Sequence, residues 1–345
     1  MVRVSVLDLV PVARGATAAM ALANALDLAR HAERLGFTRY WVAEHHNMVG
    51  IASAATSVVI GFLAGGTHAI RVGAGGIMLP NHSPLVIAEQ FGTLESLYPG
   101  RIDLGLGRAP GTDQETLYAM RRDLHAAERF PEDVLELREL LGPLQPDQRV
   151  RAVPGFGTEV PLWILGSSLY GAQVAAHFGL PYAFASHFAP AALDHALAVY
   201  HERFKPSAQL ARPYAVAAVN VVASDNDDEA RRLFTSQQQR VTDMLRNERS
   251  TLPPPIADID QYWSPAERIQ AMRMLECSIV GSPDTVRAGL RDFIARTGVD
   301  EVIATGMIFD HEARVHSFEI LAEAARELGA SESVQAAGTA EAMLA

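Results

Sequence analysis

Short apolar segments alternate with amphipathic ones along nearly the whole chain, and this order constrains the fold more than any other feature. A strand followed by a helix, repeated about eight times, predicts a parallel sheet covered by helices. Eight such units predict a closed (β/α)8 barrel, the TIM barrel, with an open doubly wound sheet as the alternative. In a barrel the functional residues lie where the strands end. The expected strands are Val4–Leu9, Arg39–Glu44, Arg71–Leu79, Arg101–Gly107, Leu162–Leu165, Tyr182–Ser186, Tyr214–Val222 and Glu301–Ile308.

Two insertions interrupt this rhythm, one after the fourth strand and one after the seventh. A helix expected at Gln114–Leu141 is followed by a stretch rich in proline and glycine at Gly142–Val160, and the second insertion is Thr251–Cys277. Long insertions in compact domains are usually functional, so Thr251–Cys277 is a candidate mobile lid. We expect one barrel domain over residues 1–328 and a frayed C-terminal tail over residues 329–345.

Charge and composition argue against several classes of protein. The 345 residues carry a net charge of −11 without any basic run, which disfavours nucleic acid and anionic membrane surfaces as partners. No stretch is apolar over the roughly 18 residues that a membrane span needs. Cys277 is the only cysteine, so no internal disulfide can form, and the N-terminus has no signal-peptide core. We therefore expect a cytoplasmic protein.

Glu44, His45 and His46 follow the second expected strand. Histidine titrates near neutral pH, which suits it to proton transfer, although one imidazole packed under a loop and one in solvent is the alternative. Adjacent strand residues point to opposite faces, so His45 and His46 are poorly placed to share a metal ion, and no metal site is predicted. Three further ionisable residues near strand ends are interpreted as structural: Asp8, His82 and His187.

Small residues and a cation follow the next three strands. The tiny residues of Gly73–Gly76 leave no side-chain wall, so a flat ring could lie on their backbone, with a bulge or tight packing as the alternative. Arg108 follows a glycine-rich strand end, and its guanidinium suits phosphate. Ser167 and Ser168 precede a helix start, where backbone N–H groups bind anions, with simple N-capping as the alternative. Neighbouring strands bring these groups together, which predicts a monophosphate site; the glycine spacing fits a dinucleotide fingerprint poorly.

Taken together, these residues resemble the bacterial luciferase-like flavin monooxygenase family over nearly the whole chain, from Val4 to about Glu327. The resemblance is closest to the single-gene oxidoreductases of that family, some of which tailor aromatic polyketides in actinobacteria, including the epoxide-forming enzyme of the mensacarcin pathway. The stretches that carry it are 40–46 (YWVAEHH), 72–80 (VGAGGIMLP), 100–108 (GRIDLGLGR), 161–181 and 280–286 (VGSPDTV).

The resemblance implies a barrel that binds reduced FMN, reacts it with O2 through a C4a-hydroperoxide, and oxygenates a small organic substrate. It places the active-site histidine on His45, a non-prolyl cis peptide under the flavin on Gly75-Gly76, and the phosphate contacts on Arg108, Ser167 and Ser168. Gly171 stands where the family has a further hydroxyl residue, so one phosphate contact is lost or replaced. The resemblance also implies a separate NAD(P)H:flavin reductase and a homodimer formed through the helices at 53–65 and 84–98.

Three alternatives remain open. A deazaflavin-dependent oxidoreductase on the same fold would transfer hydride without O2. A flavin-binding protein without turnover is less compatible with the intact Glu44, His45 and Arg108. A metal-dependent barrel hydrolase is the weakest alternative. The substrate and the type of oxygenation, epoxidation or hydroxylation of an aromatic polyketide among them, do not follow from the sequence.

Overall fold

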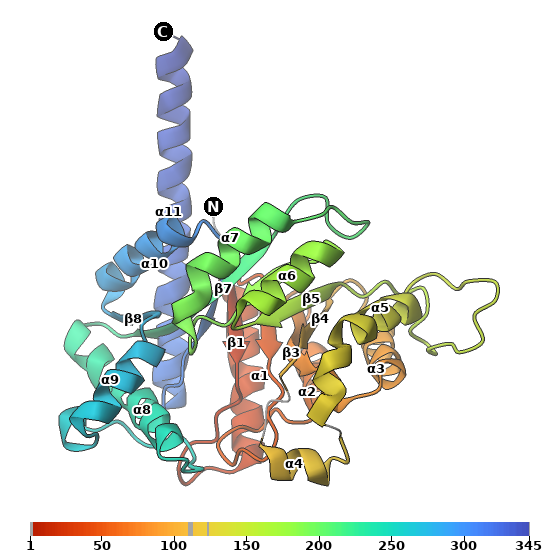
Figure 1. Cartoon of the computed structure of the whole chain (residues 1–345). Helices are drawn as coiled ribbons and strands as arrows, with labels where there is room; N and C mark the ends of the chain where they lie inside the picture. Colours follow the sequence, from red (N-terminus) through yellow and green to blue (C-terminus); the bar gives the residue numbers. More distant parts are fainter. Residues whose placement is uncertain (1–2, 110–112, 123, 345) are drawn as a thin grey trace.

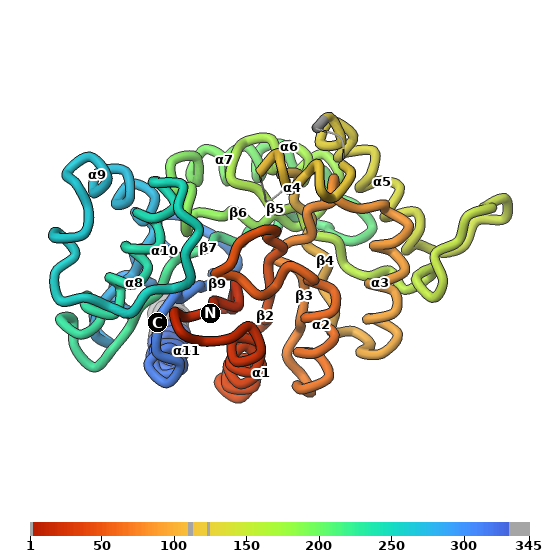
Figure 2. The backbone as a smooth tube through the Cα atoms, turned by 90° about the horizontal axis from the view of Figure 1, so that it is seen from below, coloured from red at the N-terminus to blue at the C-terminus, as the bar shows by residue number. Residues whose placement is uncertain are grey.

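Eight parallel strands close into a barrel surrounded by helices, which confirms the TIM barrel. The computed structural model describes residues 3–109, 113–122 and 124–344. Around the ring each strand pairs with the next, and the last pairs with both β7 and β1 (Figure 2). The ring consists of β1 (Arg3–Asp8), β2 (Arg39–Val42), β3 (Arg71–Met78), β4 (Ile102–Gly107), β5 (Leu162–Gly166), β6 (Tyr182–Phe184), β7 (Ala215–Ala223) and β9 (Glu301–Thr305).

A ninth strand, β8 (Ser278–Gly281), lies outside the ring and was not expected from the sequence. It pairs in parallel with the carboxyl half of β7, from Asn220 to Ala223, whereas β9 pairs with the amino half. Four residues are too few to show the alternation of apolar and polar residues that marks a strand. The sequence pattern therefore does not distinguish β8 from the insertion that precedes it.

Helices cover the outside of the barrel (Figure 1). Several begin or end at the signals that the sequence carries: Thr17 caps α1 by accepting a hydrogen bond from the Met20 N–H, and Gly36 ends it in the left-handed region at φ 83°. The covering helices are α1 (Ala18–Leu35), α2 (Thr56–Gly65), α3 (Pro84–Leu97), α5 (Phe130–Leu141), α6 (Leu169–Phe178), α7 (Leu193–Arg203), α8 (Asp227–Leu245), α10 (Pro283–Thr297) and α11 (His311–Leu344). The C-terminal part of α11 extends beyond the barrel (Figure 1).

Two helix predictions differ from the structure. The helix expected at Gln114–Leu141 is divided into α4 (Gln114–Ala119), a 3-10 turn at Leu124–Arg129, and α5. Arg121 has a left-handed φ of 56°, so a helix that begins at Gln114 cannot continue through it. Pro131, at the start of α5, has no N–H to donate to a carbonyl in a preceding turn, so α5 begins as a separate helix. The last helix continues to Leu344 instead of ending near Leu328. The single domain and the fraying of the tail stay predictions.

The insertion after α8 packs back onto that helix. It contains a 3-10 turn at Ile259–Gln261 and α9 (Pro265–Met274), which begins with a capping box between Ser264 and Glu267. The Arg246 guanidinium pairs with Glu267 at 2.7 Å, and the Tyr262 hydroxyl donates to Asp243 on α8. Its role as a mobile lid stays a prediction.

The inside of the barrel is apolar in the middle and ionic at its amino end. Inward-facing residues of alternate positions fill the middle layer: Leu7, Trp41, Ala43, Trp163, Ala183, Val216, Ala218 and Ile303. Beneath them the buried Arg39 guanidinium donates to Asp103 at 2.7 Å and to Glu301 at 2.8 and 3.0 Å. These groups close the amino end, so an open cavity can form only at the carboxyl end. No helix of the described residues is long and apolar enough to cross a membrane.

Candidate functional site

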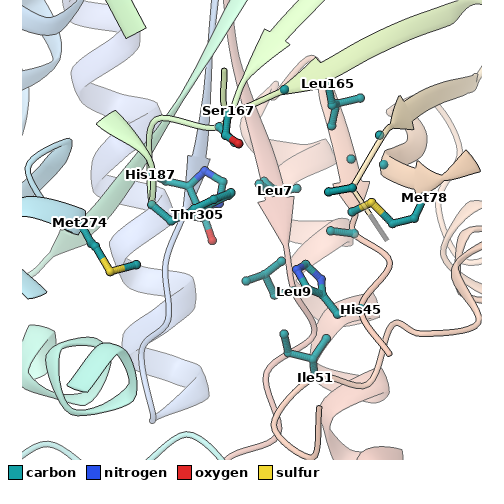
Figure 3. A pocket seen from close by; sticks show the side chains of 18 of the residues that line it. Leu7, Leu9, His45, Ile51, Met78, Leu165, Ser167, His187, Met274 and Thr305 are labelled. Carbon is teal, nitrogen blue, oxygen red and sulfur yellow. The ribbon is translucent and has the colours of Figure 1, made fainter. Parts of the chain in front are cut away.

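One cavity of about 390 Å³ opens at the carboxyl ends of the strands. Figure 3 shows His187, Thr305 and Met274 on one side of this space and Leu9, His45 and Ile51 on the other. All six site residues that the sequence predicts line it: His45, Gly75, Gly76, Arg108, Ser167 and Ser168. The structure therefore brings the predicted histidine, glycines, cation and serines together around a single space.

His45 follows β2 on the inward-facing side of the alternation that also places Trp41 and Ala43 inside the barrel. Its Nδ1 is buried and has no hydrogen-bond partner among the described residues. Burial lowers the pKa of the imidazole below its ordinary value of 6.5. His45 is therefore a neutral imidazole at pH 7 that lines the cavity, and its buried Nδ1 is left without a hydrogen-bond partner in the described part of the chain.

Glu44 and His46 lie on the other face and do not line the cavity. The buried Glu44 carboxylate accepts hydrogen bonds from His46 Nε2 at 2.7 Å, from His82 Nε2 at 2.9 Å and from the Met78 N–H at 3.0 Å. Burial alone would raise its pKa, but the two histidine contacts outweigh burial and lower the pKa to about 2. This cluster fixes the loop that carries His45, which agrees with the structural interpretation of His82.

The glycines of β3 combine tight packing with exposure to the cavity. The strand has a bulge between Ala74 and Ile77, and the Gly75-Gly76 peptide bond is cis. A Cβ on Gly76 would lie 2.7 Å from the Gly105 carbonyl oxygen, and one on Gly75 would lie 2.7 Å from Leu7 Cδ1. A side chain at Gly76 would push against the β4 backbone, and one at Gly75 would displace the Leu7 side chain, so this side of the cavity is bare backbone.

The cation and the serines lie at one end of the cavity. Arg108 has its guanidinium carbon 4.1 Å from the centre of the Tyr170 ring and has no ion pair with a carboxylate among the described residues. Ser168 occupies the N-cap position of α6, but its side chain makes no capping hydrogen bond, so simple N-capping does not account for it. Gly171 also lines the cavity, next to Tyr170.

Five polar residues of the cavity wall were not considered as site residues from the sequence: Tyr170, Asn220, Gln237, Arg240 and Thr305. Asn220 is an amide inside the apolar run of β7, a signal that could have found it, and its Nδ2 donates to the His187 carbonyl at 2.6 Å. His187 also lines the cavity, and burial lowers its pKa to about 3. Asp8 lies elsewhere, buried against Arg314 at 2.6 Å. Within the described residues, no three His, Cys, Asp or Glu side chains form a group that could hold a metal ion.

Comparison with known proteins agrees with this arrangement. The family model described as luciferase-like monooxygenase matches residues 2–301. The chain belongs to this family. A luciferase-like monooxygenase of Escherichia coli K12 is 54% identical over 325 residues, which are 94% of this chain and 97% of that protein. The solved structure of apo-MsnO8 is 34% identical, with a TM-score of 0.87 over 94% of this chain and 99% of that one. Members of the family are flavin-using oxidoreductases.

Two more distant solved structures share the fold and differ in cofactor. The oxygenating constituent of 3,6-diketocamphane monooxygenase from Pseudomonas putida, in complex with FMN, is 17% identical, with a TM-score of 0.68 over 93% of this chain and 96% of that one. An F420-dependent secondary alcohol dehydrogenase is 15% identical, with a TM-score of 0.69 over 94% and 98%. At these identities the likeness is one of fold alone.

Proposed function

We propose that this chain is a monooxygenase that binds reduced FMN in the cavity and uses O2 to oxygenate a small organic substrate. The observation that carries the proposal is the convergence of three features in one cavity. These are the bare backbone of Gly75-Gly76, the neutral His45 imidazole, and the Arg108 guanidinium, which pairs with no carboxylate of the described residues. A flat ring with a phosphate tail fits a glycine surface that ends at a cation. Bound FMNH2 would supply the electrons that reduce O2 while one oxygen atom passes to the substrate.

The phosphate end of the site is formed by Arg108 and the start of α6. The guanidinium offers a fork of N–H donors, and the hydroxyls of Ser167 and Ser168 are not used for capping. The backbone N–H groups of the first turn of α6 add further donors and a favourable dipole. The ring of Tyr170 limits the directions that the guanidinium can take, so this end of the site is partly organised before the cofactor binds.

His45 and the apolar walls serve the reaction itself. As a neutral base in the cavity wall, His45 can hold or move a proton at the reacting atoms. Leu7, Leu9 and Ile51 line the cavity beside it, and Met274 and Leu275 are contributed by the insertion after α8. Apolar walls exclude water, which favours transfer of the oxygen atom to the substrate over its release as hydrogen peroxide.

An anaerobic titration followed by an O2 pulse tests this function. The chain is titrated with FMNH2 without O2, and then O2 is added while flavin absorbance is followed. We expect tight binding of FMNH2 and a return of oxidised flavin that is slower than in free solution. No binding of FMNH2 would contradict the proposal. Binding of a reduced deazaflavin with hydride transfer and no O2 uptake would instead establish the alternative chemistry that an F420-dependent neighbour has.

We also propose the surroundings in which the chain works. A separate NAD(P)H:flavin reductase supplies FMNH2, and the free, buried Cys277 suits a reducing cytoplasm. A homodimer forms through α2 and α3, because both helices expose apolar side chains: Val58, Phe62, Val86 and Leu97. Replacing Phe62 by Glu should convert the dimer to a monomer in light-scattering chromatography, and an unchanged mass would contradict this interface.

A further inference from the structure

Arg240 is a cation in the cavity wall that the proposed flavin site does not use. It lies on α8 and is half-buried, and its guanidinium has no hydrogen bond or ion pair with any described residue. The nearest acidic influence is Asp243, one turn along the same helix, whose carboxylate accepts from the Tyr262 hydroxyl and from Ser250 Oγ at 2.5 Å. Burial lowers the pKa of Arg240, which reflects the cost of holding a cation there without a partner.

The rest of the cavity makes this cation unusual. No aspartate or glutamate is among the described residues that line it, although the whole chain has a net charge of −11. Arg108 and Arg240 are its two arginines, and they serve different parts of it. Arg108 lies beside Tyr170 and the start of α6. The charge of Arg240 acts on His45 instead, where it adds to the effect of burial in lowering the pKa of the His45 imidazole. An anion is therefore favoured at each of two places.

The helix that carries Arg240 is held firmly by polar contacts. Gln237, one turn earlier, is buried, and its Nε2 donates to Asn220 Oδ1 at 2.5 Å, which ties α8 to β7. Thr235 Oγ1 accepts from the Ile256 N–H at 2.8 Å, and Gln239 Nε2 donates to the Pro254 carbonyl at 2.9 Å. The guanidinium is thus presented from a fixed element, as a binding residue must be.

Most of the remaining cavity wall is apolar and adaptable. Leucine, isoleucine and valine side chains contribute, together with five of the ten methionines of the chain: Met48, Met78, Met244, Met274 and Met307. Methionine is unbranched and polarizable, so it packs against apolar bodies of varied shape. A molecule that fits this part of the cavity has an apolar body and one anionic end.

We propose that the substrate of this enzyme carries a carboxylate, which Arg240 binds, while its apolar body reaches toward His45. The inference rests on the proposed function in that the bound molecule is taken to be the substrate that is oxygenated. The binding of a carboxylate by Arg240 does not depend on that function. A planar guanidinium matches a carboxylate with two parallel hydrogen bonds. Binding the substrate by its anionic end fixes which part of the apolar body meets the reacting oxygen.

Calorimetric titration of the flavin-free full chain with matched pairs of ligands tests this proposal. The probes are octanoate against octanamide and 4-phenylbutyrate against 4-phenylbutyramide, at pH 7.5. We expect each acid to bind wild type about tenfold more tightly than its amide, since charge-assisted hydrogen bonds exceed neutral ones by about this factor. Arg240→Gln should abolish the preference, and Arg240→Lys should restore part of it.

Two variants keep the result specific. Arg232→Gln removes an arginine of the same helix that is paired with Glu229 on the surface, and it should keep the full preference for acids. Arg108→Ala should also keep it. Equal binding of acid and amide, failure of both acids to bind, survival of the preference in Arg240→Gln, or its loss in Arg108→Ala would each overturn the proposal.

A separate titration with FMNH2 distinguishes the two proposals. If the acid preference depends on Arg240 but FMNH2 does not bind, the carboxylate site stands and the proposed flavin chemistry fails. If FMNH2 binds and the acids show no preference, the flavin function stands and the carboxylate site fails. Arg240→Gln should bind FMNH2 as wild type does, which also shows that this variant is folded.

Discussion

The Arg108 guanidinium stacks on the Tyr170 ring, with its central carbon 4.1 Å from the ring centre. Tyr170 directly precedes Gly171, the position at which the family resemblance implies a lost hydroxyl contact. Both residues line the cavity, so the aromatic ring and its hydroxyl group lie at the end of the site where the resemblance implies that one phosphate contact is lost or replaced.

Substitution of Arg108 should weaken flavin binding. Loss of a charge-assisted contact costs about 1.5–3 kcal/mol, so Arg108→Ala should raise the dissociation constant for FMNH2 by roughly 10- to 150-fold. An anaerobic fluorescence titration measures this, with riboflavin, which has no phosphate, as the control ligand. Riboflavin affinity should be the same in both proteins. An unchanged affinity for FMNH2 would remove Arg108 from the phosphate site.

Tyr170 offers a graded test of the stack. A cation–π contact at a partly exposed site is worth about 0.5–1 kcal/mol, so Tyr170→Leu should weaken FMNH2 binding by roughly two- to fivefold. Tyr170→Phe retains the ring. If the phenylalanine variant binds as wild type, the ring alone matters, whereas equal weakening in both variants would assign the effect to the hydroxyl group.

His45 should matter for turnover and not for cofactor affinity. Proton transfer by a positioned side chain contributes about 10²–10⁴ in rate, so His45→Ala should lower coupled oxygenation by at least about a hundredfold. Because burial lowers its pKa below 6.5, His45 stays neutral above that pH, and activity should fall only under more acidic conditions. Product formed per flavin oxidised, measured from pH 5 to 8, checks both statements. A wild-type yield in the variant would exclude a catalytic role.

The sequence predicts the barrel and the site residues that follow its strands for one physical reason. Strand alternation is local, so Trp41, Ala43 and His45 fall on the inward face while Glu44 falls on the outward one, as the structure shows. Arg240 follows no such rule. The helix α8 buries polar side chains such as Gln237 against β7, so an apolar stripe does not mark its inner face. Contacts between α8 and β7, which are distant in the sequence, determine that Arg240 faces the cavity.

His187 should make stability depend on pH. Its folded-state pKa of about 3 lies below the ordinary value of 6.5, so the unfolded chain binds a proton first as the pH falls. Above pH 6.5 both states are neutral and His187 has no effect. By pH 5 it should cost about 2 kcal/mol of unfolding free energy. Urea unfolding at pH 7.5 and pH 5 should show a smaller loss in His187→Asn than in wild type. His195→Gln, on the exposed side of α7, is the control.

Asp103 should matter for stability and not for the site. Its buried carboxylate accepts from Arg39 at 2.7 Å and from Arg71 at 2.6 Å, at the amino end of the barrel. Asp103→Asn leaves Arg39 with Glu301 alone, and breaking such a buried pair costs about 3–5 kcal/mol. Asp292→Asn removes an exposed pair with Arg291, which is worth little. Urea unfolding should separate the two variants by this amount. Because the cavity lies at the opposite end of the strands, the folded Asp103→Asn protein should bind FMNH2 as wild type does, and a weakened affinity would show that the two ends of the barrel are coupled.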